Sequence, residues 1–204
     1  MPERRRLLER SLKRLNDLAP AGYSVGAHIR FAKPLFFRST YPDAWRDAYR
    51  SGGLAMRDPL VFWGVGHTGA IRWSEVDLPD PFDIMGKAAA HGLRYGAVAA
   101  TGKITSRTIL GAARADRDLT DAELEQIRDI AEVVHEIAGD RPVLSDIERA
   151  TLRALDGGMA PAAVAETHRI SEGALDAQLS AAREKLGAGT TAEALRMARD
   201  YRLI

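Results

Sequence analysis

Cysteine is absent from this 204-residue sequence, which excludes disulfide bonds, thiolate metal ligands and cysteine nucleophiles. Long hydrophobic runs are also missing, since no apolar stretch approaches the roughly 18–20 residues that span a bilayer. The charged segment from Met1 to Arg6 precedes no apolar core, so we expect no secretory signal. These absences favour a cytoplasmic protein with no membrane association.

An excess of either charge is missing too, because 29 Lys and Arg stand against 28 Asp and Glu. Residues 141–204 carry nine of each, so the basic stripe typical of nucleic-acid binding is not seen there. The sequence has no Gly-x-Ser-x-Gly nucleophile elbow, and its five histidines lack metal-ligand spacing. We therefore expect no catalytic residue, no metal site and no enzyme activity.

Residues 1–139 read as a mixture of helices and strands. The apolar and cap patterns predict helices at 2–18, 42–51, 80–90 and 120–137. Strands are predicted at 23–31, 35–39, 95–101 and 108–114, whereas residues 53–80 show no regular pattern. The prediction is an α+β fold, an α-β-α sandwich with an antiparallel sheet between helices.

The segment Gly139 to Pro142 predicts a domain boundary, because the pattern after it is purely helical. Helices are expected at 145–155, 161–167, 171–186 and 191–201, with a tight break before Ser171. Four short helices with such a break resemble a helix-turn-helix module. We therefore predict two domains, residues 1–139 and 140–204.

Aromatic residues are few, at 6%, yet several gather between Tyr41 and Trp73. Tyr41, Trp45 and Tyr49 are spaced four residues apart, so their rings share one helix face. Such a face is either simply core or the wall of a small-molecule pocket. The pocket is favoured by the partners that buried Tyr and Trp polar atoms need, and by the cost of burying Asp58 without a donor.

The pattern Tyr-x3-Trp-x3-Tyr-x8-Asp-Pro-x13-Trp, from Tyr41 to Trp73, resembles the ligand-binding signature of the LuxR-type quorum-sensing regulators. The turn from Gly92 to Gly96 is similar to that family's turn into the sheet. The segment 144–148 and the sequence from Leu155 to the closing Ile204 resemble the family's helix-turn-helix. The resemblance thus covers nearly the whole chain, in two halves.

The resemblance implies that the first domain encloses an N-acyl homoserine lactone, a small-molecule ligand, and needs no cofactor. Trp45 would donate to the lactone carbonyl, Tyr41 would donate to the amide carbonyl, and Asp58 would accept from the amide N–H. The resemblance adds four residues that would pack on the ligand or line the pocket: Tyr49, Trp73, Gly96 (through its backbone) and Ala112.

The far end of the pocket is less defined. The predicted strands are rich in small residues: Gly26, Ala27, Ala99, Ala100, Gly111, Ala112 and Ala113. One interpretation is a roomy apolar pocket for a long or bulky acyl chain without a bound 3-oxo group. The other is that small residues let the flanking helices pack close to the sheet.

The resemblance implies that the second domain binds DNA. Six residues are candidates for this contact: Arg169, Ser171, Glu172, Asp176, Arg183 and Lys185. The family more often has a basic or polar residue where Asp176 stands, and Glu172 and Asp176 would repel phosphates. Glu172 could still accept from a cytosine amine, and each of the three cations taken alone favours a solvated helix face over a phosphate contact.

We therefore predict a lactone-responsive transcription regulator that works as a homodimer. The leucine face of Leu8, Leu12 and Leu15 and the helix after Thr120 are candidate dimer surfaces, or they pack within one subunit. The main alternative is a degenerate relative that binds a second LuxR-type regulator and makes it inactive. A DNA-binding regulator that no longer uses a lactone is disfavoured by the intact ligand signature.

Overall fold

The computed structural model describes residues 2–30 and 33–204, and its contacts divide the chain into two compact units. The larger unit is Leu8–Gly139, and the smaller one is Asp140–Ile204 together with the residues up to Leu7. The last residue of the strand predicted at 23–31 lies outside the described residues. No helix of the described residues is long and apolar enough to cross a membrane.

The larger unit contains a five-stranded sheet of order β2-β1-β5-β4-β3, in which every neighbouring pair is antiparallel. Its strands are β1 (Gly22–Ile29), β2 (Phe36–Ser39), β3 (Gly69–Arg72), β4 (Tyr95–Thr101) and β5 (Arg107–Arg114). The predicted α+β fold with an antiparallel sheet is therefore confirmed. The edge strand β3 was not predicted, because it is only four residues long and falls in the irregular segment.

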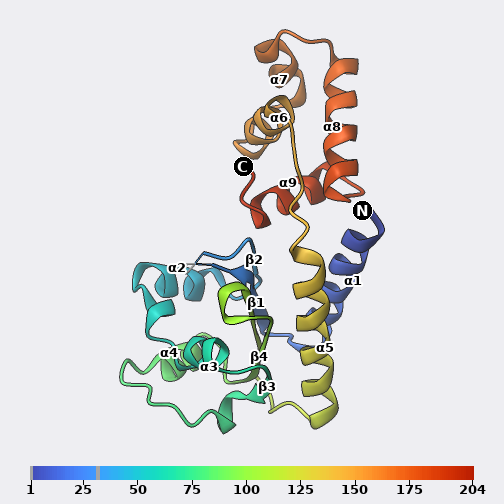
Figure 1. Cartoon of the computed structure of the whole chain (residues 1–204). Coiled ribbons are helices and arrows are strands. Elements are labelled where there is room, and N and C mark those ends of the chain that lie inside the picture. Colours follow the sequence, from blue (N-terminus) through green and yellow to red (C-terminus); the bar gives the residue numbers. More distant parts are fainter. Residues whose placement is uncertain (1, 31–32) are drawn as a thin grey trace. The chain divides into compact units, whose positions relative to one another are not determined.

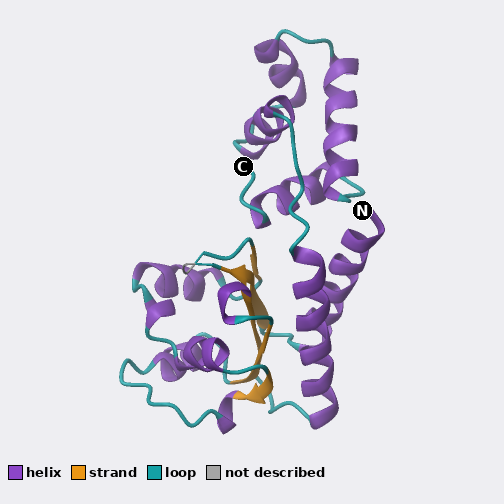
Figure 2. Ribbon diagram, in the orientation of Figure 1, coloured by secondary structure: helices purple, strands orange, loops and turns teal. Residues whose placement is uncertain are grey.

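Helices cover both faces of this sheet (Figures 1 and 2). The larger unit holds α2 (Asp43–Ser51), α3 (Pro59–Gly66), α4 (Ile84–Ala90), α5 (Asp121–Ala138) and most of α1 (Pro2–Leu18). In Figure 1, α1 and α5 lie on one side of the strands, and α2, α3 and α4 lie on the other. Helix α4 begins at Ile84, four residues after the start predicted at residue 80.

Successive residues of a strand point to opposite faces, and the register fixes which face each one takes. On β5, Ile109 and Ala113 belong to a buried apolar cluster beneath α2, α3 and α4. Thr108 instead faces α5, because its Oγ1 lies 2.8 Å from Nδ1 of His135. The residues of β5 with odd numbers therefore face the cluster, and those with even numbers face α5.

The leucines of α1 are part of the core. Leu8, Leu12 and Leu15 are fully buried within the chain. This favours the interpretation that they pack within one subunit over the interpretation that they form a dimer surface. Helix α5 is likewise amphipathic, and its buried face includes Ile127 and Val134.

The smaller unit holds α6 (Asp146–Asp156), α7 (Pro161–His168), α8 (Glu172–Leu186) and α9 (Thr191–Asp200). These helices lie where the caps predict them. Ser145 and Glu148 form a capping box at α6, in which each side chain accepts from the other residue's backbone N–H. The Ser171 side chain accepts from the N–H of Ala174 at α8.

Candidate functional site

Asp58 is the anchor of the site. It is the N-cap of α3, where its Oδ1 accepts from the Leu60 N–H at 2.8 Å, and Pro59 opens the helix. The Tyr49 hydroxyl, from α2, donates to its Oδ2 at 2.7 Å. Only 7% of Asp58 is exposed. Burial raises the pKa of this carboxyl, and the bonds from Tyr49 and Leu60 partly oppose that rise.

Tyr41 reaches the sheet just before α2. A Cβ on Gly111 would lie 2.9 Å from the Tyr41 hydroxyl, so β5 leaves a recess there that only glycine provides. Burial, and then the charge of Asp58, raise the pKa of Tyr41. The hydroxyl is therefore protonated at neutral pH and can donate. Within the described residues it makes no hydrogen bond.

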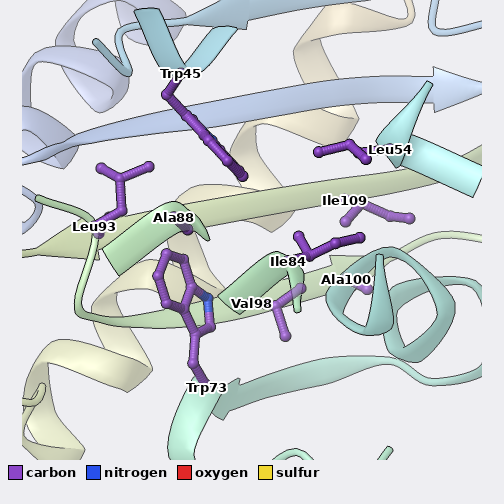
Figure 3. Close-up of a cluster of buried hydrophobic side chains, with 10 residues drawn as sticks. Trp45, Leu54, Trp73, Ile84, Ala88, Leu93, Val98, Ala100 and Ile109 are labelled. Carbon is purple, nitrogen blue, oxygen red and sulfur yellow. The ribbon is translucent and has the colours of Figure 1, made fainter. Parts of the chain in front are cut away.

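Trp73, which follows β3, packs against Gly96 of β4, as the Tyr41 hydroxyl packs against Gly111 of β5. A Cβ on Gly96 would lie 2.6 Å from Cε2 of the Trp73 indole and would also collide with the carbonyl oxygen of Ala112. The indole is 8% exposed, and its Nε1 has no hydrogen-bond partner among the described residues. Figure 3 shows this nitrogen on the side of the ring that faces Val98, inside the apolar cluster.

Trp45 enters the same cluster from the opposite side (Figure 3). Its ring packs edge-on against Tyr49 with centroids 5.5 Å apart, and against His91 at 5.4 Å. It also borders a cavity of about 390 Å³ between α2 and α4, whose walls include Lys87 and His91. Trp45 is therefore placed between the apolar cluster and an opening toward α4.

The structure thus brings most of the predicted ligand residues to one face of the sheet. Tyr41, Trp45, Tyr49 and Trp73 share the apolar cluster, Asp58 joins it through Tyr49, and Gly96 joins it beneath Trp73. These residues come from α2 and the segment before it, from β4, from the segment before α3 and from the segment after β3. The site combines one acceptor, Asp58, with several O–H and N–H donors.

Ala112 requires a correction. It was predicted to line the pocket, but it faces α5, since its number is even on β5 and it pairs with Ala97. Its neighbour Gly111 takes the pocket position instead. Sequence reasoning missed Gly111 as a site residue, because only the strand register shows which of the two residues faces the cluster.

The small residues of the strands divide between the two faces. Gly26, Ala100, Gly111 and Ala113 face the cluster side, whereas Ala27, Ala99 and Ala112 face α1 and α5. The two interpretations of these residues therefore apply to different subsets. The recess at Gly111 already accommodates the Tyr41 hydroxyl.

The candidate DNA-binding residues differ in their surroundings. Lys185 donates to both carboxylate oxygens of Glu148, at 2.6 and 2.9 Å, so it joins α8 to α6. Glu148 is buried, which raises its pKa, but Lys185 and the Ser145 N–H more than offset this and hold the pKa below its usual range. Arg169 is exposed in the turn after α7, with a φ of 56°.

The remaining residues of this group lie on α8. Ser171 caps the helix, Glu172 and Asp176 are exposed near its start, and Arg183 is half-buried near its end. Lys185 is tied to a carboxylate, so it is not a freely available phosphate ligand.

Comparison with known proteins identifies the larger unit. Residues 7–138 match the family model of the autoinducer binding domain. The chain belongs to the autoinducer-binding domain family. Domains of this family bind small-molecule ligands of the acyl-homoserine-lactone type, which confirms the resemblance seen in the ligand signature. The matched residues nearly coincide with the unit Leu8–Gly139.

Solved structures share the fold of the autoinducer-binding chain. Escherichia coli SdiA has a TM-score of 0.51 and 21% identity, over 97% of this chain and 92% of its own. The N-acylhomoserine lactone dependent LuxR family transcription factor CepR2 from Burkholderia cenocepacia has a TM-score of 0.51 and 18% identity, over 68% of this chain and 96% of its own. A search of curated proteins found no match.

Proposed function

We propose that this protein is a quorum-sensing transcription regulator of the cytoplasm, which binds an N-acyl homoserine lactone in its autoinducer-binding domain and DNA through residues 140–204 as a homodimer. The observation that carries the ligand half is the buried carboxylate of Asp58. It is held at the start of α3 by Leu60 and Tyr49, inside an apolar cluster that also contains unpartnered donors.

The ligand pose follows from these groups. Asp58 accepts from the amide N–H of the lactone, Tyr41 donates to the amide carbonyl, and Trp45 donates to the lactone carbonyl. Tyr49 holds Asp58 and packs beside Trp45, and Trp73 covers the ligand from the side of β4. One acceptor and two donors match the one N–H and the two carbonyls of the ligand.

The proposed DNA binding rests on the helices after Gly139. Helices α7 and α8 are the proposed helix-turn-helix, with Ser171 at the start of the recognition helix α8. Arg169 and Arg183 are the proposed phosphate contacts, and Glu172 can accept from a cytosine amine. Lys185 contributes through its ion pair with Glu148, which keeps α8 in place.

A second candidate function is an antagonist that forms inactive heterodimers with another LuxR-type regulator. The observation that favours it is the start of α8, where the exposed charged side chains are the acids Glu172 and Asp176. The pairing of Lys185 with Glu148 removes a further cation from competition for phosphate. Such a surface releases few counterions on DNA, so binding would be weak.

Two measurements on the full-length protein test these functions. Thermal unfolding with increasing N-acyl homoserine lactone should show a rising melting temperature, because ligand that binds only the folded state stabilises it. Selection of DNA fragments with and without the lactone, at two salt concentrations, should enrich a palindromic site that weakens with salt. Stabilisation without any enriched DNA would favour the antagonist, and no stabilisation by any lactone would refute the proposed lactone-responsive regulator.

A further inference from the structure

The cavity of about 390 Å³ between α2 and α4 has polar groups that the proposed ligand pose does not use. Trp45 is the wall that this cavity shares with the apolar cluster, into which the indole points (Figure 3). Helix α4 and its C-cap form another wall, which carries Lys87 and His91. Lys87 is exposed, so the cavity opens to solvent on this side.

Lys87 has N–H bonds to spare. Its Nζ donates to the Phe82 carbonyl at 2.7 Å, which uses one of the three N–H bonds of the ammonium. Lys87 forms no ion pair with any described residue, and no acid lines the cavity. Asp83, one turn earlier, places its carboxylate against Gly86 instead. The ammonium can therefore bind an anion in the cavity without displacing a carboxylate of the chain.

His91 offers an acceptor in the same cavity. Its Nδ1 lies 2.9 Å from the Lys87 carbonyl oxygen. Because a carbonyl oxygen can only accept, Nδ1 carries the proton, and Nε2 of the neutral ring is then an acceptor. Within the part of the chain that the structure describes, Nε2 makes no hydrogen bond. The ring packs on Trp45 with centroids 5.4 Å apart, so this acceptor lies close to the indole.

The hydrolysed form of the proposed ligand has the matching groups. Water that adds across the acyl C–O bond of the lactone opens the ring, which leaves a carboxylate and a free hydroxyl and releases a proton to solvent. The carboxylate carbon is the former lactone carbonyl carbon, which the proposed pose puts at Trp45. One carboxylate oxygen can stay with Trp45 while the other reaches Lys87, and the hydroxyl can donate to His91. The intact lactone has neither a charge nor a hydroxyl for these two residues.

We propose that the cavity between α2 and α4 binds the head group of a ring-opened N-acyl homoserine, with Lys87 on its carboxylate and His91 on its hydroxyl. This inference rests on the proposed function, because it extends the pose in which Trp45 donates to the lactone carbonyl. A carboxylate enclosed in the apolar cluster would be costly, but the open cavity keeps it partly hydrated and beside a cation. The protein therefore binds both the lactone and the product of its hydrolysis.

A comparison of ligands tests the role of Lys87. Full-length wild type and Lys87→Met are titrated by calorimetry with N-octanoyl and N-dodecanoyl homoserine lactone and with the ring-opened form of each. Wild type should bind both forms. Lys87→Met keeps the length of the side chain and deletes its charge, so the affinity for the open form relative to the lactone should fall about tenfold, as for the loss of a hydrogen bond to a charged group.

Lys103→Met is the matched control, since Lys103 is an exposed lysine between β4 and β5. It should keep the affinity ratio of wild type. An unchanged ratio in Lys87→Met, or a wild type that binds the lactones and not their open forms, would overturn the inference and leave the proposed function standing. Failure of wild type to bind any of the four compounds would refute the proposed function itself.

A further ligand isolates His91. N-octanoyl 2-aminobutyrate has the carboxylate of N-octanoyl homoserine and lacks the hydroxyl. Wild type should prefer the homoserine compound about fivefold, the usual worth of a neutral hydrogen bond. His91→Phe keeps a ring against Trp45 and removes Nε2, so it should bind the two acids equally. A preference that survives in this variant would contradict the assignment of the hydroxyl to His91.

Salt provides a test that needs no variant. Screening weakens the attraction between a carboxylate and Lys87, so the affinity of wild type for the open form should fall as salt is raised. The affinity for the uncharged lactone should stay constant. An affinity for the open form that does not depend on salt would contradict the proposed pairing with Lys87.

Discussion

The two units of the chain differ in whether their buried polar groups have partners that satisfy them. In the larger unit, Asp58 is a buried carboxyl with a raised pKa, and Trp73 carries a buried N–H without a partner. In the smaller unit, the buried Glu148 has a lowered pKa, because Lys185 and Ser145 satisfy it. The first arrangement costs stability and suits a site that a ligand completes, whereas the second stabilises a helical fold.

The largest effect is expected from Asp58→Asn, which removes the charge that the ligand amide needs. Lactone affinity should fall about 10- to 100-fold, the usual worth of a hydrogen bond to a charged group. Because burial raises the pKa of Asp58, the ionised form destabilises the unliganded protein at pH 7. The variant should therefore unfold at the same or a higher temperature without ligand, as calorimetry can measure.

Asp77→Asn is the control for this substitution, since Asp77 is exposed and precedes α4. It should leave lactone affinity and stability unchanged. A loss of stability in Asp58→Asn equal to the loss of binding energy would mean that Asp58 serves α3 alone.

The two glycines beneath the donors should respond differently to alanine. In Gly96→Ala the new methyl meets the Ala112 carbonyl and the Trp73 ring, so overpacking should cost about 1–3 kcal/mol of unfolding free energy. In Gly111→Ala it meets only the Tyr41 hydroxyl, at 2.9 Å, so stability should change little and lactone affinity should fall. Denaturant titration and ligand titration separate these effects, and equal destabilisation by both variants would contradict the recess at Gly111.

In the smaller unit, a change of charge at the start of α8 tests whether this part of the helix contacts DNA. Asp176→Lys should strengthen binding to duplex DNA, and the slope of log affinity against log salt should steepen by about 1 if the new cation meets a phosphate. Glu184→Lys, two turns further along the same helix, is the matched control. Fluorescence anisotropy at several salt concentrations gives both slopes, and an unchanged slope in Asp176→Lys would exclude the start of α8 from the DNA contact.

Acid should affect the two units at different pH, which is the smallest of these effects. Burial, the stacked ring of His28 and the charge of Arg107 lower the pKa of His135. The unfolded chain then binds the proton more tightly, so this contribution to stability is present above about pH 6.5 and is lost as pH falls. Glu148, with a lowered pKa, contributes stability that is lost only below its ordinary range, near pH 4.5.

When the pH is lowered from 7 to 4, the larger unit should therefore lose stability before the smaller one. His135→Gln should flatten the pH dependence between pH 7 and 5, with the fluorescence of the tryptophans, which all lie in the larger unit, as the probe. A slope that persists in this variant would assign the acid sensitivity to another group.

Local patterns allowed most helices to be predicted. A capping box is a pattern of only four consecutive residues that predicts a helix start. The boxes at Thr120 and Ser145 both occur as expected. Helix α3 was missed, although Asp58 and Pro59 form a good start for it. The reason is physical, since Gly64 and Gly66 weaken helix propensity, and tertiary packing of Gly64 against Ile109 supplies the stability.

The site could be predicted as far as it depends on the aromatic spacing. Trp45 and Tyr49 lie on α2 as the helical period predicts, whereas Tyr41 precedes the helix, and the hydrogen bond from Tyr49 brings Asp58 to this group. The face of Ala112 could not be predicted, because a shift of one residue in a strand reverses its orientation. The ion pair of Lys185 with Glu148 was also out of reach, since 37 residues separate the two.

The ion pair between Lys185 and Glu148 links the binding of a phosphate by Lys185 to the stability of α6. The carboxylate of Glu148 receives the lysine ammonium and, at the same time, the Ser145 N–H that starts α6. A phosphate that drew Lys185 away would leave this buried carboxylate short of a cation and loosen the first turn of α6. Any nucleic acid that recruits this lysine is therefore in competition with the folding of the module that carries it.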